Sequence, residues 1–215
     1  MTKKLFIFDL DGTIADTIES IREAINMTMK GYGYPEKSYE EVRCAIGNGA
    51  RELIRRCLPE EKREDEAYVA EVFARYESHY DVTYVHLNGC YSGVREAILD
   101  LHKKGNILAV LSNKQDLYTK KIIDWLFPEH PFSFVQGQTD LPRKPDPTVP
   151  RMIMEQLGMS GKNVFFVGDS EVDVLTAHNA GMTAVGCTWG YRGEEILRQS
   201  GADILLHHGE EIARL

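Results

Sequence analysis

The chain has 215 residues, 43% of them hydrophobic, which is enough to bury a sizeable core in one large or two modest domains. Twenty-five basic and 33 acidic residues give a formal net charge of −8, which argues against a surface for nucleic acid or an anionic membrane. The four cysteines lack C-x-x-C spacing, and the first apolar run is too short for a signal sequence or a membrane span. We therefore expect reduced thiols and a cytoplasmic location.

Two carboxylates follow the first apolar run of the sequence. Residues 5–17 read LFIFDLDGTIADT, and 5–8 have the composition of a strand buried on both faces of a parallel sheet. Asp9 and Asp11 follow where this strand leaves the core, and Gly12 allows a sharp turn. An Asp-Gly turn alone would leave Asp9 unexplained, because a carboxylate at the end of a buried strand is costly unless it is paired or bound to a metal. The segment predicts a functional site.

The next segment reads as a helical insertion. Residues 16–83 show helical periodicity without a convincing strand, and the next strand candidate begins only at residue 107. A βαβ unit needs only roughly 30 residues. We predict a helical cap domain at 16–83, inserted into a discontinuous core domain made of 1–15 and 84–215. An insertion at the carboxyl end of the first strand is placed to act as a lid.

The second half of the chain alternates between strand and helix patterns. Strands are predicted at 107–111, 134–135, 164–167, 183–187 and 204–206, and helices at 94–104, 117–126, 149–157, 172–180 and 194–199. This alternation predicts an α/β protein with a doubly wound, Rossmann-like parallel sheet.

Polar residues that could bind a ligand follow the second predicted strand and precede a predicted helix. Ser112 and Asn113 offer a hydroxyl and an amide that could hold phosphate oxygens at the helix N-terminus, although such residues are more often simple caps. Lys144 lies in the segment RKPDP at 143–147, where prolines restrict the backbone, and the alternative is a solvated loop charge.

A second apolar strand, VFFV, also ends in acidic residues. Asp169, Ser170 and Asp173 follow it within the sequence GDSEVD at 168–173. An acidic residue in the first turn of a helix also favours the helix dipole, so Asp173 could serve only that purpose.

These residues together predict phosphoryl transfer through an aspartyl phosphate. Asp9 and Asp169 could share a hard cation, and Lys144 adds a positive charge. At about 4 Å, an Asp9 anion and one phosphate charge repel by about 4 kcal/mol at an effective dielectric near 20, so we expect Mg²⁺ as the cofactor. Asp11 is placed to protonate the leaving oxygen and later to activate water.

The four segments resemble, in order, the four motifs of the haloacid dehalogenase-like phosphatases, over residues 5 to about 206. The resemblance implies that Asp9 is the nucleophile and Asp11 the general acid/base. It implies that Ser112 and Lys144 bind phosphate, and that Asp169 and Asp9 bind Mg²⁺ together with the backbone carbonyl of Asp11.

The same resemblance covers residues beside those ligands. Asp173 and Ser170 are expected to lie next to the metal ligands, with Asp173 reaching the metal at most through water. Asn113 stays a candidate phosphate contact because of its amide, beside Ser112. The insertion after the first motif resembles the subclass with a helical cap at this point, and residues 16–17 would begin its hinge.

The segment IGNGA at 46–50 resembles phosphoglycolate phosphatases, as do YSGV at 91–94 and WGY at 189–191. A helix start flanked by glycines could present N–H groups to an anionic substrate, which makes Gly47, Asn48, Gly49 and Arg51 candidates for substrate contacts. A plain turn between helices explains the segment equally well.

Other functions stay open. Dehalogenases of this family lack the second acid, so Asp11 favours phosphate chemistry. β-Phosphoglucomutases usually have valine where Thr13 stands and a histidine after the hinge, which is absent here, so hydrolysis is favoured over phosphate transfer. An inorganic pyrophosphatase fits the motifs too, while a phospho-accepting regulatory domain would not need the helical insertion. The expected partner is a small phosphorylated metabolite, not nucleic acid or membrane.

Overall fold

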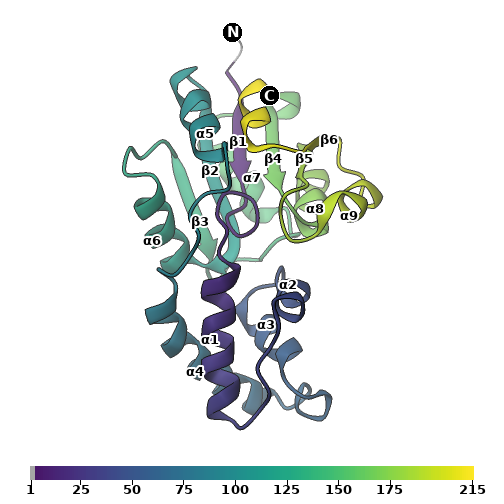
Figure 1. The fold of residues 1–215 in the computed structure, drawn as a ribbon. Coiled ribbons are helices and arrows are strands. Elements are labelled where there is room, and N and C mark those ends of the chain that lie inside the picture. Colours follow the sequence, from purple (N-terminus) through teal and green to yellow (C-terminus); the bar gives the residue numbers. More distant parts are fainter. Residues whose placement is uncertain (1–2) are drawn as a thin grey trace. The chain divides into compact units, whose positions relative to one another are not determined.

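A computed structural model describes residues 3–215, which divide into two units. The first unit combines the chain up to Asp16 with Gly89–Leu215, and the second is Thr17–Asn88 (Figure 1). The boundaries thus differ from those predicted at 15/16 and 83/84. Asp16 belongs with the first unit because its backbone N–H donates to the carbonyl of Gly89 at 3.0 Å. The units are described separately below.

A six-stranded parallel sheet forms the centre of the first unit. Its strands are β1 (Leu5–Phe8), β2 (Ile107–Gln115), β3 (Phe134–Gln138), β4 (Val164–Gly168), β5 (Thr183–Cys187) and β6 (Ile204–Leu206), in the order β3-β2-β1-β4-β5-β6. Strand β1 lies between β2 and β4, with Leu5 opposite both Ile107 and Val164. The doubly wound parallel sheet confirms the predicted α/β class.

Two strands are longer than the sequence pattern predicted. β2 continues to Gln115 instead of ending at residue 111, and β3 continues to Gln138 instead of ending at 135. The reason is an irregularity in their pairing: after Leu111 pairs with Gln136, the two strands pair again at Gln115 and Gln138. Residues 112–114 therefore lie within an irregular strand end and not in a separate loop.

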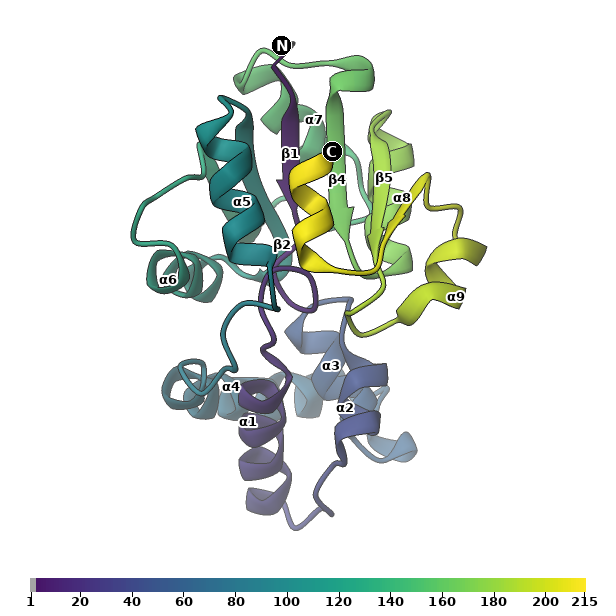
Figure 2. The same ribbon diagram turned by 45° about the horizontal axis from the view of Figure 1, so that its top comes forward.

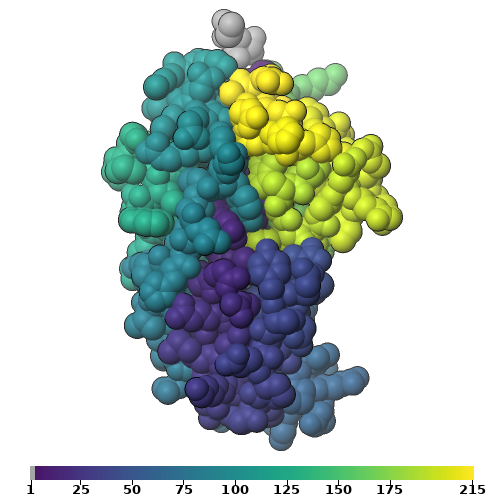
Figure 3. All heavy atoms as spheres, viewed as in Figure 1, coloured from purple at the N-terminus to yellow at the C-terminus, as the bar shows by residue number. Residues whose placement is uncertain are grey.

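Helices cover both faces of this sheet (Figure 2). They are α5 (Val94–Lys103), α6 (Asp116–Leu126), α7 (Thr148–Gln156), α8 (Glu171–Ala180) and α9 (Gly193–Gln199), with short turns η2 (Gly161–Asn163) and η3 (Gly209–Arg214). On one face, Ile153 of α7 and Ala177 of α8 join a core cluster with Ile7 and Phe166 of the sheet. The C-terminal η3 turn packs beside α5 at the surface (Figure 3).

The second unit is a small helical bundle. It consists of α1 (Ile18–Gly31), α2 (Tyr39–Ala45), α3 (Ala50–Cys57), the turn η1 (Glu60–Lys62) and α4 (Glu66–Thr83). The apolar faces of α1 and α4 pack together, burying Ile25 and Met29 together with Val69 and Val72. The predicted role of this unit as a lid stays a prediction. No helix in residues 3–215 is long and apolar enough to cross a membrane.

Candidate active site

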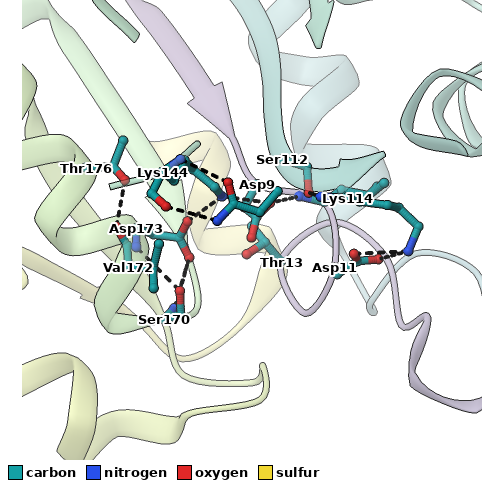
Figure 4. Close-up of polar contacts among 12 residues, drawn as sticks. Asp9, Asp11, Thr13, Ser112, Lys114, Lys144, Ser170, Val172, Asp173 and Thr176 are labelled. Carbon is teal, nitrogen blue, oxygen red and sulfur yellow. Dashed lines mark hydrogen bonds and ion pairs between the residues drawn. The ribbon is translucent and has the colours of Figure 1, made fainter. Parts of the chain in front are cut away.

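The carboxyl ends of three adjacent strands meet at one edge of the sheet. Asp9 follows β1, Ser112 lies near the end of β2, and Asp169 follows β4. In an open α/β sheet, this edge is where ligands bind. Figure 4 shows that Lys144, from the segment between β3 and α7, also reaches this group.

Lys144 makes two short ion pairs there. Its Nζ lies 2.9 Å from Oδ1 of Asp9 and 2.7 Å from Oδ1 of Asp173, and its side chain is only 2% exposed. Burial alone would lower the pKa of Lys144, but the carboxylates of Asp173 and Asp9 raise it above its ordinary value, so the ammonium stays charged. The alternative of a solvated loop charge is therefore wrong.

Asn113 fixes the backbone that carries this lysine. Its side-chain Nδ2 donates to the carbonyl oxygen of Lys144 at 3.1 Å, and its Oδ1 accepts from the backbone N–H of Lys144 at 3.0 Å. The amide thus joins the end of β2 to the segment before α7. Its predicted contact with phosphate stays a prediction.

Three carboxylates form the acidic part of the site. Asp9, Asp169 and Asp173 each offer an oxygen within 4.8 Å of the other two. Burial raises the pKa of Asp9 to about 6, and Lys144 opposes that shift. Burial and the charges of Asp173 and Asp9 raise the pKa of Asp169 well above its ordinary value.

These residues fit a hard divalent cation. Asp9 and Asp173 pair with Lys144, and the buried carboxylate of Asp169 lies in the same group, so a cation would offset the repulsion among the three carboxylates. Oxygen atoms are the ligands that such cations take. Asp173 was expected beside the metal ligands, whereas the structure groups its carboxylate directly with Asp9 and Asp169. The carboxylate of Asp11 is directed elsewhere, toward Lys114.

Asp173 serves two structural purposes at once. Ser170 is the N-cap of α8 and forms a capping box with Asp173: the backbone N–H of Asp173 donates to Oγ of Ser170 at 3.4 Å, and the backbone N–H of Ser170 donates to Oδ2 of Asp173 at 3.1 Å. The Ser170 hydroxyl also donates to Oδ2 of Asp173, at 2.6 Å. The other oxygen, Oδ1, accepts from Lys144. The expected role at the start of the helix is thus present, together with one in the site.

Lys114 is a residue of the site that the sequence did not single out. Its Nζ lies 2.9 Å from Oδ1 and 3.1 Å from Oδ2 of Asp11. Ser112 is buried beside it, and its hydroxyl oxygen accepts from the backbone N–H of Lys114 at 3.3 Å. One signal was available in the sequence, because Lys114 directly follows Ser112 and Asn113, two candidate phosphate ligands after a predicted strand.

The segment after β5 packs closely against Asp169. The backbone N–H of Tyr191 donates to Oδ2 of Asp169 at 2.7 Å, and the indole N–H of Trp189 donates to the carbonyl of Thr13 at 3.1 Å. A Cβ on Gly190 would lie 2.3 Å from Cβ of Asp169, so only glycine fits at position 190. The same crowding applies at Gly12, which has φ +82 and where a Cβ would lie 2.4 Å from Oδ2 of Asp169.

The candidate substrate residues in the helical unit lie between α2 and α3. Gly49, with φ +85, is the N-cap of α3, and the Oδ1 of Asn48 accepts from Nη2 of Arg56 at 2.8 Å. Arg51 is half exposed and pairs with Glu66 at 3.1 Å. These contacts are ones that a turn between helices would also make, so substrate binding by Gly47, Asn48, Gly49 and Arg51 stays a prediction.

Comparison with known proteins assigns the family. The model of the haloacid dehalogenase-like hydrolase family matches residues 6–187, a range that includes Asp9, Lys144 and Asp169. The chain belongs to this family. We expected an enzyme of this family that acts as a phosphatase. The curated proteins that the chain resembles confirm this expectation.

Two of these haloacid dehalogenase-like relatives are phosphoglycolate phosphatases. The protein from Vibrio cholerae is 34% identical over 210 residues, which cover 94% of this chain and 92% of the relative. The protein from Haemophilus influenzae is 32% identical over 206 residues, which cover 93% of this chain and 92% of the relative. Among solved structures, a predicted phosphoglycolate phosphatase from Haemophilus somnus is 31% identical with a TM-score of 0.86, covering 100% of this chain and 98% of its own.

Proposed function

We propose that this enzyme is a Mg²⁺-dependent phosphatase that hydrolyses a small anionic phosphomonoester, phosphoglycolate or a close analogue, through an aspartyl phosphate on Asp9. The observation that supports this most is the position of Lys144 between Asp9 and Asp173, at 2.9 and 2.7 Å, with Asp169 in the same buried group. The names of the relatives support the substrate class.

The contacts of Asp9 distinguish its two oxygens. Oδ1 accepts from the backbone N–H of Leu10 at 2.7 Å and from Lys144 at 2.9 Å. These two donors hold the carboxylate in one orientation, which is the positioning that a nucleophile needs. Oδ2 is then the oxygen that attacks phosphorus.

The remaining residues take the roles that charge and position allow. Asp9, Asp169 and Asp173 would hold the metal, and when Mg²⁺ is bound it supplies positive charge that offsets the repulsion between Asp9 and the phosphate. Lys144 and the hydroxyl of Ser112 bind the phosphate oxygens.

Asp11 moves the proton in both steps. As the bond from Oδ2 of Asp9 to phosphorus forms, the bond from phosphorus to the leaving oxygen breaks, and Asp11 gives its proton to that oxygen. Asp11 then accepts a proton from the water that attacks phosphorus, which releases inorganic phosphate and restores the Asp9 carboxylate.

The test is phosphate release by the purified full-length protein. We expect Mg²⁺-dependent release from 2-phosphoglycolate, suppression by a chelator, and kcat/KM for this ester above those for inorganic pyrophosphate and β-glucose 1-phosphate. Highest kcat/KM with pyrophosphate would contradict the substrate class. No turnover of any phosphate compound by folded protein with Mg²⁺ would contradict the proposed activity.

A further inference from the structure

A second nearly buried lysine lies at the site, and its partner is Asp11. The Nζ of Lys114 contacts both carboxylate oxygens, at 2.9 and 3.1 Å, and the two side chains are only 7% and 13% exposed. Figure 4 shows this pair lying apart from the group around Lys144. The two lysines therefore contact different carboxylates, Lys144 that of the expected nucleophile and Lys114 that of the expected acid/base.

The irregular end of β2 directs Lys114 toward Asp11. Leu111 pairs with Gln136 and Gln115 with Gln138, so β2 has two more residues than β3 over this stretch. Extra residues of this kind bend a strand and change the direction in which its side chains point. A regular strand would alternate its side chains across the two faces of the sheet, whereas here Lys114 reaches the segment that follows β1.

Residues of β3 and α6 pack closely against the backbone of Lys114. A Cβ on Gly137 would lie 2.4 Å from the carbonyl oxygen of Lys114, so β3 can approach this closely only with glycine. The hydroxyl of Thr119 lies 3.2 Å from the same carbonyl oxygen. The lysine thus extends from a fixed point, and its ammonium cannot move far without leaving Asp11.

We propose that Lys114 is a positioning residue that holds the carboxyl of Asp11 in the orientation required for proton transfer to the leaving oxygen. The inference depends on the proposed function, in which Asp11 is the general acid/base. Contact with both oxygens fixes the rotation of the carboxyl group. When Asp11 carries its proton, the unprotonated oxygen can keep its contact with Lys114 while the protonated oxygen faces the leaving group.

This role predicts a dependence on the leaving group. An alkoxide such as that of glycolate needs protonation as it departs, whereas p-nitrophenolate is stable enough to leave without it. General acid catalysis contributes roughly 10²- to 10⁴-fold where it is needed. Misplacing Asp11 should therefore slow alkyl esters much more than p-nitrophenyl phosphate.

The experiment measures kcat/KM, which reports the steps up to departure of the leaving group, for 2-phosphoglycolate and p-nitrophenyl phosphate. In Lys114→Met we expect a loss of about tenfold or more with 2-phosphoglycolate and less than about threefold with p-nitrophenyl phosphate. Lys114→Gln keeps one donor and should fall between this variant and the wild type. The matched control is Lys120→Met on α6, which removes an exposed lysine paired with Asp116 at 2.7 Å and should change neither value.

A double-mutant cycle separates positioning from substrate binding. If Lys114 acts only through Asp11, then Lys114→Met should cause no further loss in an Asp11→Asn background. Circular dichroism and the melting temperature show that each variant is folded, and the double variant has no unpaired charge left at this pair.

Different results would overturn the positioning role of Lys114 and the proposed function. Equal losses with both esters in a folded Lys114→Met variant, or an undiminished loss in the Asp11→Asn background, would overturn the positioning role. A rise in KM confined to 2-phosphoglycolate would also overturn it, because Lys114 would then bind the substrate carboxylate. No hydrolysis of either ester by the wild type would contradict the proposed function itself.

Discussion

The sheet unit has buried ion pairs at its strand ends in addition to exposed pairs on its helices, such as Lys104 with Asp100. In the sheet unit, Lys144 and Asp173 are each 2% exposed and lie 2.7 Å apart. In the helical unit, pairs such as Arg43 with Glu40 join neighbouring turns of one helix and are 33% and 66% exposed. Exposed pairs of this kind contribute about 0–1 kcal/mol, whereas separating buried partners costs several times more. Buried ion pairs at a strand end therefore indicate a functional site, while exposed ion pairs on the helical unit mostly contribute to its solvation.

The largest effect is expected from removing the proposed nucleophile of the sheet unit. Asp9→Asn keeps the shape of the side chain but removes its negative charge, so phosphatase activity should fall roughly a thousandfold or more. The measurement is Mg²⁺-dependent phosphate release, with the melting temperature as the control for folding. Activity close to that of the wild type would show that Asp9 does not attack phosphorus.

Removing the lysine between the carboxylates should affect stability and activity together. Lys144→Met leaves Asp9 and Asp173 buried without their cation, which should lower the free energy of unfolding by about 3–5 kcal/mol. Urea denaturation measures this change, and activity should be nearly lost. Lys120→Met, an exposed lysine in an i,i+4 pair, should change the free energy of unfolding by less than about 1 kcal/mol. Similar changes in both variants would remove the contrast between buried and exposed pairs.

A smaller effect is expected from crowding the expected metal ligand. Gly190→Ala places a Cβ against Asp169, which must shift, so affinity for Mg²⁺ should fall by about 10- to 100-fold. The readout is the rise in melting temperature as Mg²⁺ is added. Gly31→Ala in α1 adds a Cβ with no atom within 4 Å and should leave that response unchanged. An identical Mg²⁺ response in the two variants would argue against a ligand role for Asp169.

The smallest effect concerns the helical unit and pH. Burial and the nearby charge of Arg75 lower the pKa of His79, whose Nδ1 lies 2.9 Å from Oγ1 of Thr28. The folded state therefore favours the neutral ring, so its contribution is complete above the unfolded pKa of about 6.5 and is lost as the pH falls below it. The wild type should lose more stability than His79→Gln between pH 7.5 and about 5.5 in urea denaturation. Parallel losses would show that His79 does not titrate with folding.

The sequence was sufficient for features that depend on neighbouring residues. The apolar runs before Asp9 and Asp169 predicted buried strands of a parallel sheet, and prolines around Lys144 predicted a restrained lysine. These patterns are local, and the rule that ligands bind at the carboxyl ends of the strands joins them into one site.

Other features depend on contacts between distant parts of the chain. The direction of Lys114 follows from the irregular pairing of β2 with β3, and periodicity within one strand does not contain that information. Asn113 holds the backbone of Lys144, which lies 31 residues further along. The need for glycine at position 190 arises from Asp169, a neighbour only in the folded structure. Such contacts become visible when the strand ends are placed beside one another.

The proposed mechanism requires that phosphate is transferred to Asp9 before water releases it. Acid quenching of the enzyme during turnover of 2-phosphoglycolate, followed by peptide mass spectrometry, tests this directly. We predict a phosphorylated peptide spanning residues 5–17, with the modification on Asp9 and absent from Asp9→Asn. Turnover without any phosphorylated peptide at early times, or phosphate on a different residue, would contradict transfer through Asp9.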